Sequence, residues 1–260
     1  MTSLSDAVTL LGACSAPSEA FWRLIELDAV RRAGPQFRDP VLEVGCGDGV
    51  FTRLTGIPVQ VGSDRAARAV SRARTQGPYD RVLQLDLNGC DGADIGLFGT
   101  VFANSVLEHV PRVELGLAAL RARLVPGGRL IATVPLEAMN EHLASQHPRY
   151  VAWRQRQLQH RNLWSKATWE RNLLAAGFAQ VTWADYLPAQ ACRLWDRADV
   201  LATLGAGRFR AAPALHHATS RILTESTRTR AKHAVGRRLL RRAAACSSGP
   251  PCAGLLCAVA

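Results

Sequence analysis

A glycine-rich turn directly after an apolar strand constrains this chain more than any other feature of its sequence. Residues 41–49 read Val-Leu-Glu-Val-Gly-Cys-Gly-Asp-Gly, with glycine at positions 45, 47 and 49. Glycine adopts positive φ angles without steric cost and lets the backbone approach a ligand closely. A glycine turn after the first strand of an α/β unit is where nucleotide-containing ligands bind. The pattern therefore predicts an α/β fold with such a binding site at this turn.

Strand-like and helix-like segments alternate along the chain on both sides of this turn. The expected strands cover residues 40–44, 58–63, 81–86, 100–104, 129–134 and 178–183. The expected helices cover residues 18–32, 65–75, 113–124, 165–176 and much of 188–242. Ser165 is the expected N-cap of the fourth helix, with Trp164 and Trp169 placed as a hydrophobic staple. Regular alternation of strands and helices predicts a parallel sheet.

Acidic residues lie at or near the ends of three of the expected strands. Glu43 lies in the first strand, Asp64 ends the second 21 residues later, and Asp86 ends the third. A carboxylate at the end of the second strand can accept hydrogen bonds from both hydroxyls of a ribose. The extra carboxylates of Glu43 and Asp48 would repel a pyrophosphate, so they favour a cationic amino-acid ligand. Glu43 is placed to contact an ammonium group directly or through water.

Residues 41–49 resemble motif I of the class I S-adenosylmethionine-dependent methyltransferases. The resemblance continues at residues 62–64 (Gly-Ser-Asp), 85–87 (Leu-Asp-Leu), 104–110 (Asn-Ser-Val-Leu-Glu-His-Val) and 124–130 (Leu-Val-Pro-Gly-Gly-Arg-Leu). It covers about residues 38–186 together with the last strand. The motifs are similar to those of the small-molecule and glycan type, with a methyltransferase type 11-like domain.

The resemblance implies a Rossmann-like α/β fold built on a seven-stranded sheet in the order 3-2-1-4-5-7-6. Strand 7 of such a sheet is antiparallel, and residues 254–259 are the candidate for it. The implied organisation is an N-terminal helical cap (1–37), a cofactor-binding core (38–187), a basic helical insertion (188–252) and a final core strand (253–260).

The implied cofactor is S-adenosyl-L-methionine, with S-adenosyl-L-homocysteine as the product. In addition to Glu43, the resemblance places Gly45, Cys46 and Gly47 at the methionine part, Asp64 at the ribose, Asp86 and Leu87 beside the adenine, and Asn104 and Ser105 where strand 4 closes the pocket. Cysteine is common at this turn in the family, so Cys46 is not interpreted as a nucleophile.

His109 is the candidate catalytic residue, because it follows strand 4 near the expected position of the reactive methyl group. A hydroxyl acceptor usually needs a general base, whereas a carbon or amine acceptor can react without one. The alternative is that Glu108 and His109 only hold the loop. His142, His147 and His160 lie in the segment after strand 5, which often covers the acceptor site in this family.

The motif after strand 4 restricts the classes of methyl acceptor that are expected. It lacks the Asn/Asp-Pro-Pro-Tyr/Phe pattern of adenine and glutamine N-methyltransferases. Small-RNA 2′-O-methyltransferases carry Glu-x-x-Glu-His with a further histidine for a divalent metal. Ser105 stands here in place of the first glutamate, so no metal is expected. The Leu-Glu-His-Val form resembles bacterial methyltransferases of quinones, sugars, glycans, lipids and secondary metabolites. The expected reaction is methyl transfer to oxygen or carbon of a small molecule or glycan/lipid intermediate.

The charge of the chain is concentrated in one segment. Residues 208–242 carry +9 of the formal net charge of +11. Such a segment favours a phosphate-bearing substrate or an anionic membrane surface, and a solvated helical face is the simpler explanation. An RNA methyltransferase that binds phosphates through this segment is an alternative. No additional RNA-binding module is recognisable, which argues against a nucleic-acid partner. A non-catalytic, cofactor-binding regulatory protein is the third hypothesis.

The expected location is the cytoplasm, with peripheral membrane contact through residues 208–242. The seven cysteines contain no Cys-x-x-Cys pair, which is typical of reduced thiols in a bacterial-type cytoplasm. No basic region precedes the short apolar patch near the N-terminus, so no secretory signal is expected. The sequence does not indicate an oligomeric state.

Overall fold

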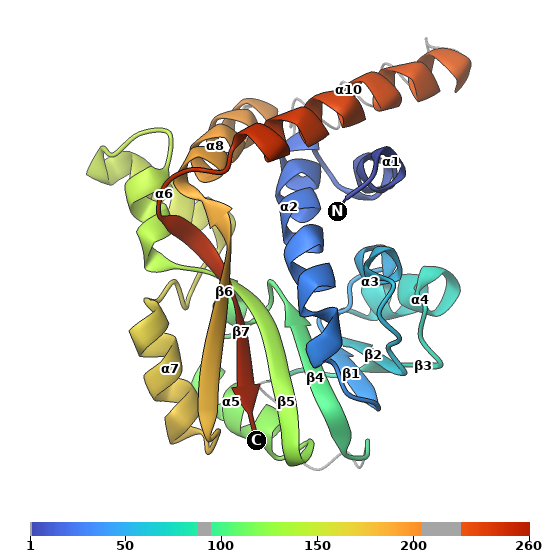
Figure 1. The fold of residues 1–260 in the computed structure, drawn as a ribbon, viewed down its shortest axis with the longest axis vertical. Helices are drawn as coiled ribbons and strands as arrows, with labels where there is room; N and C mark the ends of the chain where they lie inside the picture. Colours follow the sequence, from blue (N-terminus) through green and yellow to red (C-terminus); the bar gives the residue numbers. More distant parts are fainter. Residues whose placement is uncertain (1, 88–94, 204–224) are drawn as a thin grey trace.

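Seven strands form one mixed sheet in the order β3-β2-β1-β4-β5-β7-β6 (Figure 1). The computed structural model describes residues 2–87, 95–203 and 225–260. The strands are β1 (Val41–Val44), β2 (Val61–Asp64), β3 (Arg81–Gln84), β4 (Phe98–Asn104), β5 (Leu124–Pro135), β6 (Gln180–Pro188) and β7 (Pro251–Val259). Strand β7 runs antiparallel to both of its neighbours, whereas the pairs from β3 to β5 are parallel. The predicted fold and strand order are confirmed.

Helices cover both faces of this sheet. The α-helices are α1 (Leu4–Ala13), α2 (Pro17–Ala33), α3 (Val50–Thr55), α4 (Ala67–Gln76), α5 (Val113–Arg121), α6 (Pro148–Leu158), α7 (Lys166–Ala175), α8 (Ala189–Thr203) and α10 (Glu225–Ala245). Short 3₁₀ helices are η1 (Gly34–Gln36), η2 (Leu107–His109) and η3 (Glu137–His142).

Side chains of the central strands alternate between two hydrophobic clusters, because successive strand residues point to opposite faces. Val101 of β4 packs with α5 and α7 on one face. Its neighbour Phe102 packs with α2 and α8 on the other. All seven residues of β4 are buried, as expected for a central parallel strand covered on both sides.

Two local predictions have different outcomes. The start of α7 is confirmed: Ser165 accepts a hydrogen bond from the Thr168 N–H, and the rings of Trp164 and Trp169 lie 4.8 Å apart. The expected helix over residues 113–124 ends earlier, at Arg121, and β5 already begins at Leu124. The backbone passes residues 126–128 inside the strand, with a φ of 73° at Gly127. The sequence pattern also gave no indication of α6.

The N-terminal helix α1 packs against the C-terminal helix α10. A side chain at Gly236 would approach Leu4 to within 3.2 Å, so a glycine allows the two helices to lie close together. Helix α10 carries the arginines of residues 225–242 and extends beyond the sheet (Figure 1). Residues 208–224 of the predicted basic segment lie outside the described residues. Among the described helices, none combines the length and apolar character that crossing a membrane requires.

Candidate active site

The glycine turn after β1 lies at the carboxyl edge of the parallel strands. Gly45, Gly47 and Gly49 have φ angles of 71°, 58° and 78°. The Gly47 N–H donates a hydrogen bond of 3.1 Å to Oδ2 of Asp64, at the end of β2. Oδ1 of the same carboxylate accepts from the Ala66 N–H at 2.8 Å. The ends of β1 and β2 are thus joined through one carboxylate, which keeps further lone pairs for a ligand.

Two of these glycines are required by close packing as well as by their φ angles. A Cβ atom at residue 45 would lie 2.3 Å from Cγ2 of Val106, in the loop after β4. A Cβ atom at residue 49 would lie 2.5 Å from the Cα atom of Gly77. At Gly47 a Cβ atom would meet nothing within 4 Å, so only its backbone conformation favours glycine there.

Glu43 is buried beneath the turn. Its carboxylate accepts hydrogen bonds from the Thr52 hydroxyl at 2.7 Å and from the Tyr79 hydroxyl at 2.8 Å. Burial raises the pKa of Glu43 to about 7. Three glycines, at 49, 62 and 77, leave the space that the Tyr79 ring fills. Glu43 therefore connects β1 with α3 and with the segment before β3.

A cavity of about 840 Å³ opens along this edge of the sheet. Its walls are formed by Val44, Gly45, Asp64, Arg65, Leu85, Asp86, Leu87, Ser105, Val106, His109, Val110, Pro111, Gln155, Arg156, Gln159, His160 and Arg161. Six of the predicted site residues are therefore brought together here: Gly45, Asp64, Asp86, Leu87, Ser105 and His109. Glu43, Cys46, Gly47 and Asn104 are not among the described residues of these walls.

Cys46 and Asn104 lie behind the cavity wall. Cys46 packs with Val70, Ala73 and Val82, and burial raises the pKa of its thiol to about 12. The side chain therefore stays a neutral thiol, which is consistent with the interpretation that Cys46 is not a nucleophile. Asn104 accepts a hydrogen bond of 3.0 Å from the Thr133 hydroxyl.

A buried carboxylate that the sequence analysis missed lies next to the end of β4. Glu26 of α2 is fully buried and forms an ion pair of 2.6 Å with Arg23. It accepts hydrogen bonds from the hydroxyls of Ser105 at 2.7 Å and Tyr186 at 3.1 Å. Burial opposes ionisation of Glu26, but the charge of Arg23 and the bond from Ser105 lower its pKa overall. In the sequence nothing distinguishes Glu26 from a solvent-exposed acidic residue of a helix.

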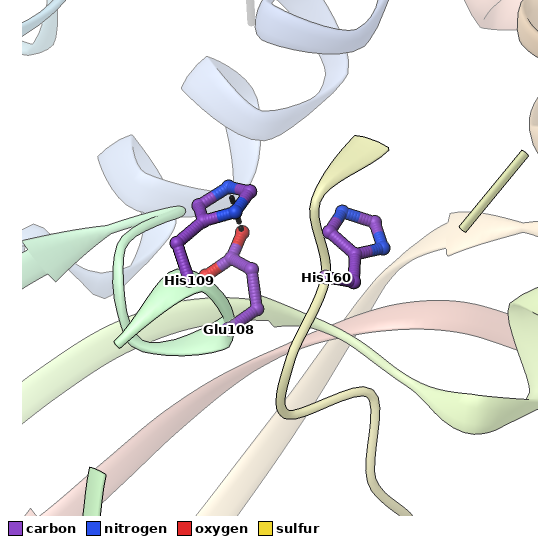
Figure 2. A group of neighbouring side chains, drawn as sticks. All are labelled: Glu108, His109 and His160. Carbon is purple, nitrogen blue, oxygen red and sulfur yellow. Dashed lines mark ion pairs between the residues drawn. The ribbon is translucent and has the colours of Figure 1, made fainter. Parts of the chain in front are cut away.

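Two histidines face each other across the cavity (Figure 2). The rings of His109, in η2, and His160, just after α6, have centroids 5.5 Å apart. Burial lowers the pKa of His109 and lowers that of His160 to about 3. His142 and His147 are not among the described residues that line the cavity. His147 instead caps α6, where its side chain accepts from the Arg149 N–H.

Glu108 lies beside the two histidines (Figure 2), and it was not among the predicted site residues. Its Oε1 atom is 3.8 Å from Nε2 of His109. Its Oε2 atom is buried without a hydrogen-bond partner, and burial raises the pKa of this carboxyl group to about 8. A carboxyl next to a histidine in the loop after a strand is a recognisable signal. The proximity of His160 could not be recognised from the sequence, because 50 residues separate it from residue 110.

Asn162 holds these two distant segments together. Its side-chain amide donates hydrogen bonds of 2.8 Å to the carbonyls of Leu107 and Val110. The backbone N–H groups of Arg161 and Asn162 both donate to the carbonyl of Glu108. The loop after β4 and the segment after α6 therefore form one wall.

Residues 18–182 match the family model described as a methyltransferase domain. An uncharacterized protein from Synechococcus sp. is 34% identical over 108 residues, a match that covers 37% of this chain and 25% of that protein. The chain thus spans about a quarter of the length of this curated relative.

Two solved structures have a similar fold. One is a SAM-dependent methyltransferase from Archaeoglobus fulgidus, with a TM-score of 0.55, 15% identity and coverage of 92% of this chain and 94% of that one. The other is the plantazolicin methyltransferase BpumL in complex with a pentazolic desmethylPZN analog and SAH. Its TM-score is 0.51, with 10% identity and coverage of 92% and 84%.

We expect Gly45→Ala to destabilise the protein more than Gly47→Ala. Both replacements carry the left-handed backbone cost of ~1–2 kcal/mol, but only the new methyl group at 45 collides with Val106. Urea unfolding should show at least about 1 kcal/mol of additional loss for Gly45→Ala, the usual size of an overpacking effect. Adding Val106→Ala should recover part of that loss. Equal losses in the two single variants would contradict this explanation.

Proposed function

This chain belongs to the methyltransferase domain family, and from that premise we propose that it methylates an oxygen or carbon atom of a small molecule or glycan/lipid intermediate. The chain is an S-adenosylmethionine-dependent methyltransferase. The proposal concerns its acceptor and the roles of its residues. In the reaction, the acceptor's electron pair forms a bond to the methyl carbon while the carbon–sulfur bond breaks. S-adenosyl-L-homocysteine leaves, and a hydroxyl acceptor also loses its proton.

One observation carries the proposal: a single cavity joins the predicted cofactor residues to a polar wall from another part of the chain. Gly45, Asp64 and Leu87 line one side, and residues 155–161 line the other. Its volume of about 840 Å³ is in the upper range of small-ligand pockets. Alignment of two reactants and exclusion of water are what methyl transfer requires of a protein. This cavity is suited to both.

In this proposal the cofactor extends along the strand ends. Asp64 binds the ribose hydroxyls, Asp86 and Leu87 flank the adenine, and Gly45 and Ser105 border the methionine part. The four predicted residues that do not line the cavity support its shape without contacting the cofactor. The Gly47 N–H orients Asp64, Asn104 bonds to Thr133 and Glu26, Cys46 fills the space under the turn, and Glu43 fixes the turn through Thr52 and Tyr79.

The acceptor side of the cavity is basic. Arg156 and Arg161 both line it, and guanidinium groups recognise phosphate through paired hydrogen bonds. This supports an acceptor that carries phosphate, as a diphosphate-linked sugar or lipid does. We propose a cytoplasmic location, with the exposed arginines of α10 in contact with an anionic membrane surface.

His109 is the proposed catalytic base for a hydroxyl acceptor. Its Nδ1 atom lies 3.1 Å from the carbonyl oxygen of Gln159, so Nδ1 is the protonated nitrogen and Nε2 keeps a free lone pair. The side chain is 41% exposed within the cavity wall. Of the histidines that line the cavity, it is the one that follows β4.

Asp64→Ala should weaken S-adenosylmethionine binding about 10- to 100-fold, because hydrogen bonds to a charged group contribute ~1.5–3 kcal/mol. Asp48→Ala is a matched control. Each of these carboxylates accepts a hydrogen bond from the N–H two residues later, but Asp48 does not line the cavity. Calorimetry measures both affinities. Unchanged affinity in Asp64→Ala would contradict the proposed ribose contact.

His109→Ala should lower kcat about 10²–10⁴-fold, the usual contribution of general acid–base catalysis. Cofactor affinity should stay within about twofold, because the ring belongs to the acceptor side. His142→Ala, outside the cavity wall, is the control. A variant that loses cofactor affinity without losing kcat would assign His109 to cofactor binding instead.

The acceptor class is tested with purified protein, radiolabelled S-adenosylmethionine and an extract of the source cells. We expect label in the small-molecule, glycan or lipid fraction. Ribonuclease-sensitive label would establish the RNA methyltransferase alternative. Cofactor binding without label in any fraction would favour the non-catalytic regulatory alternative.

A further inference from the structure

Three ligand-type side chains converge on the acceptor side of the cavity: Glu108 and His109 from η2, and His160 from the segment after α6 (Figure 2). One donor atom from each lies within 4.8 Å of the other two. Two imidazoles and one carboxylate are a common ligand set of divalent transition metals in proteins.

Both histidines are held in the tautomer that a metal requires. Nδ1 of His109 lies 3.1 Å from the Gln159 carbonyl oxygen, and Nδ1 of His160 lies 3.0 Å from Oε1 of Gln155. Gln155 is itself oriented, because its amide nitrogen donates to Asn140 at 2.7 Å. Since both acceptors are oxygen atoms, each Nδ1 carries the proton and each Nε2 offers a lone pair. In metal-binding histidines, the ring nitrogen that does not bind the metal typically donates a hydrogen bond to an oxygen atom in this way.

Glu108 supplies an independent observation. Its side chain is only 2% exposed, and its Oε2 atom has no hydrogen-bond partner. A buried carboxylate oxygen without a partner is costly, and a cation would satisfy it. Arg23 and Glu26 nearby form an ion pair of 2.6 Å, so the electrostatic effects of their two charges on the Glu108 carboxylate largely cancel.

The backbone around the three residues is rigid enough for a preformed site. The Glu108 carbonyl accepts from two N–H groups of the segment that follows His160. The buried Asn162 bonds to the carbonyls on both sides of η2. Bond lengths of ~2.0–2.2 Å to zinc require donors about 3–3.5 Å apart. Glu108 Oε1 and His109 Nε2 are 3.8 Å apart, so side-chain rotation closes that pair.

We propose that Glu108, His109 and His160 bind one divalent first-row transition ion of the zinc type. The two imidazole donors favour such an ion over Mg²⁺ or Ca²⁺, which prefer oxygen ligands alone. The sequence analysis expected no metal, because Ser105 replaces a glutamate. In the structure the Ser105 hydroxyl donates to Glu26, and His160 from another segment is the third donor of the proposed site.

Three protein ligands leave coordination positions open toward the cavity, as in catalytic sites. Resting on the proposed function, we assign these positions to the acceptor oxygen. A divalent ion lowers the pKa of a bound hydroxyl, so the acceptor loses its proton to solvent before the methyl group arrives. With the ion bound, His109 acts on the acceptor through the metal rather than as a free base.

Titration with Co²⁺ tests the site without turnover. After dialysis against a chelator, the full-length protein should bind one Co²⁺ per chain and develop visible ligand-field absorption. Glu108→Gln, His109→Ala and His160→Ala should each weaken binding about 10- to 100-fold. His142→Ala should bind Co²⁺ like the unmodified protein. Circular dichroism and S-adenosylhomocysteine affinity, unchanged in each variant, exclude loss of folding as the cause.

The proposal is overturned if the unmodified protein binds no Co²⁺ or if His160→Ala binds it equally well. Turnover separates this outcome from failure of the proposed function. Methyl transfer that persists in a chelator would retain the function and reject the metal. Stoichiometric Co²⁺ binding with no labelled acceptor would retain the metal site and reject the acceptor assignment.

Discussion

The buried carboxylate of Glu26 is the interaction on which both halves of the site depend. A buried charge is costly unless it is paired and fully hydrogen-bonded, and Glu26 meets this condition only when three elements are in place. Arg23 pairs with it from α2, Ser105 reaches it from the end of β4, and Tyr186 reaches it from β6. Helix α2 is therefore fixed against the edge of the sheet that borders the cavity, where we propose that cofactor and acceptor meet.

The residues of the proposed cofactor half of the site could be found from the sequence because their signals are local. A glycine at positive φ, an apolar strand and an acid at the next strand end are each visible within a few residues of sequence. They placed Gly45, Asp64 and Leu87 in one cavity. The strand order followed from the resemblance, and the last strand was found because an apolar run of residues ends the chain.

The acceptor half was not predictable to the same degree, because it is made by contacts between distant segments. Nothing in the sequence pairs Asn162 with the carbonyls of η2, or Gln155 with His160. The helix α6, which brings residues 155–160 to the cavity, gave no usable periodicity. Glu26 was missed for the same reason, since a helical acid is ordinarily solvated. In each case tertiary packing, and not local pattern, decides which polar residues come together at the candidate site.

The two proposed walls of the cavity also differ in how they are built. The cofactor wall is built from strand ends and tight turns, where Val106 and the Gly45 backbone leave little freedom for change. The proposed acceptor wall is one helix and its C-terminal segment. It is joined to α8 through the ion pairs of Arg154 with Asp196 and Asp199, and to η2 through Asn162 and the Glu108 carbonyl. Side chains such as Arg156 and Arg161 can change on that wall without contact with the glycine turn of the proposed cofactor site. The proposed acceptor specificity therefore rests on residues 155–161, which come from a different segment of the chain than the proposed cofactor residues but line the same cavity.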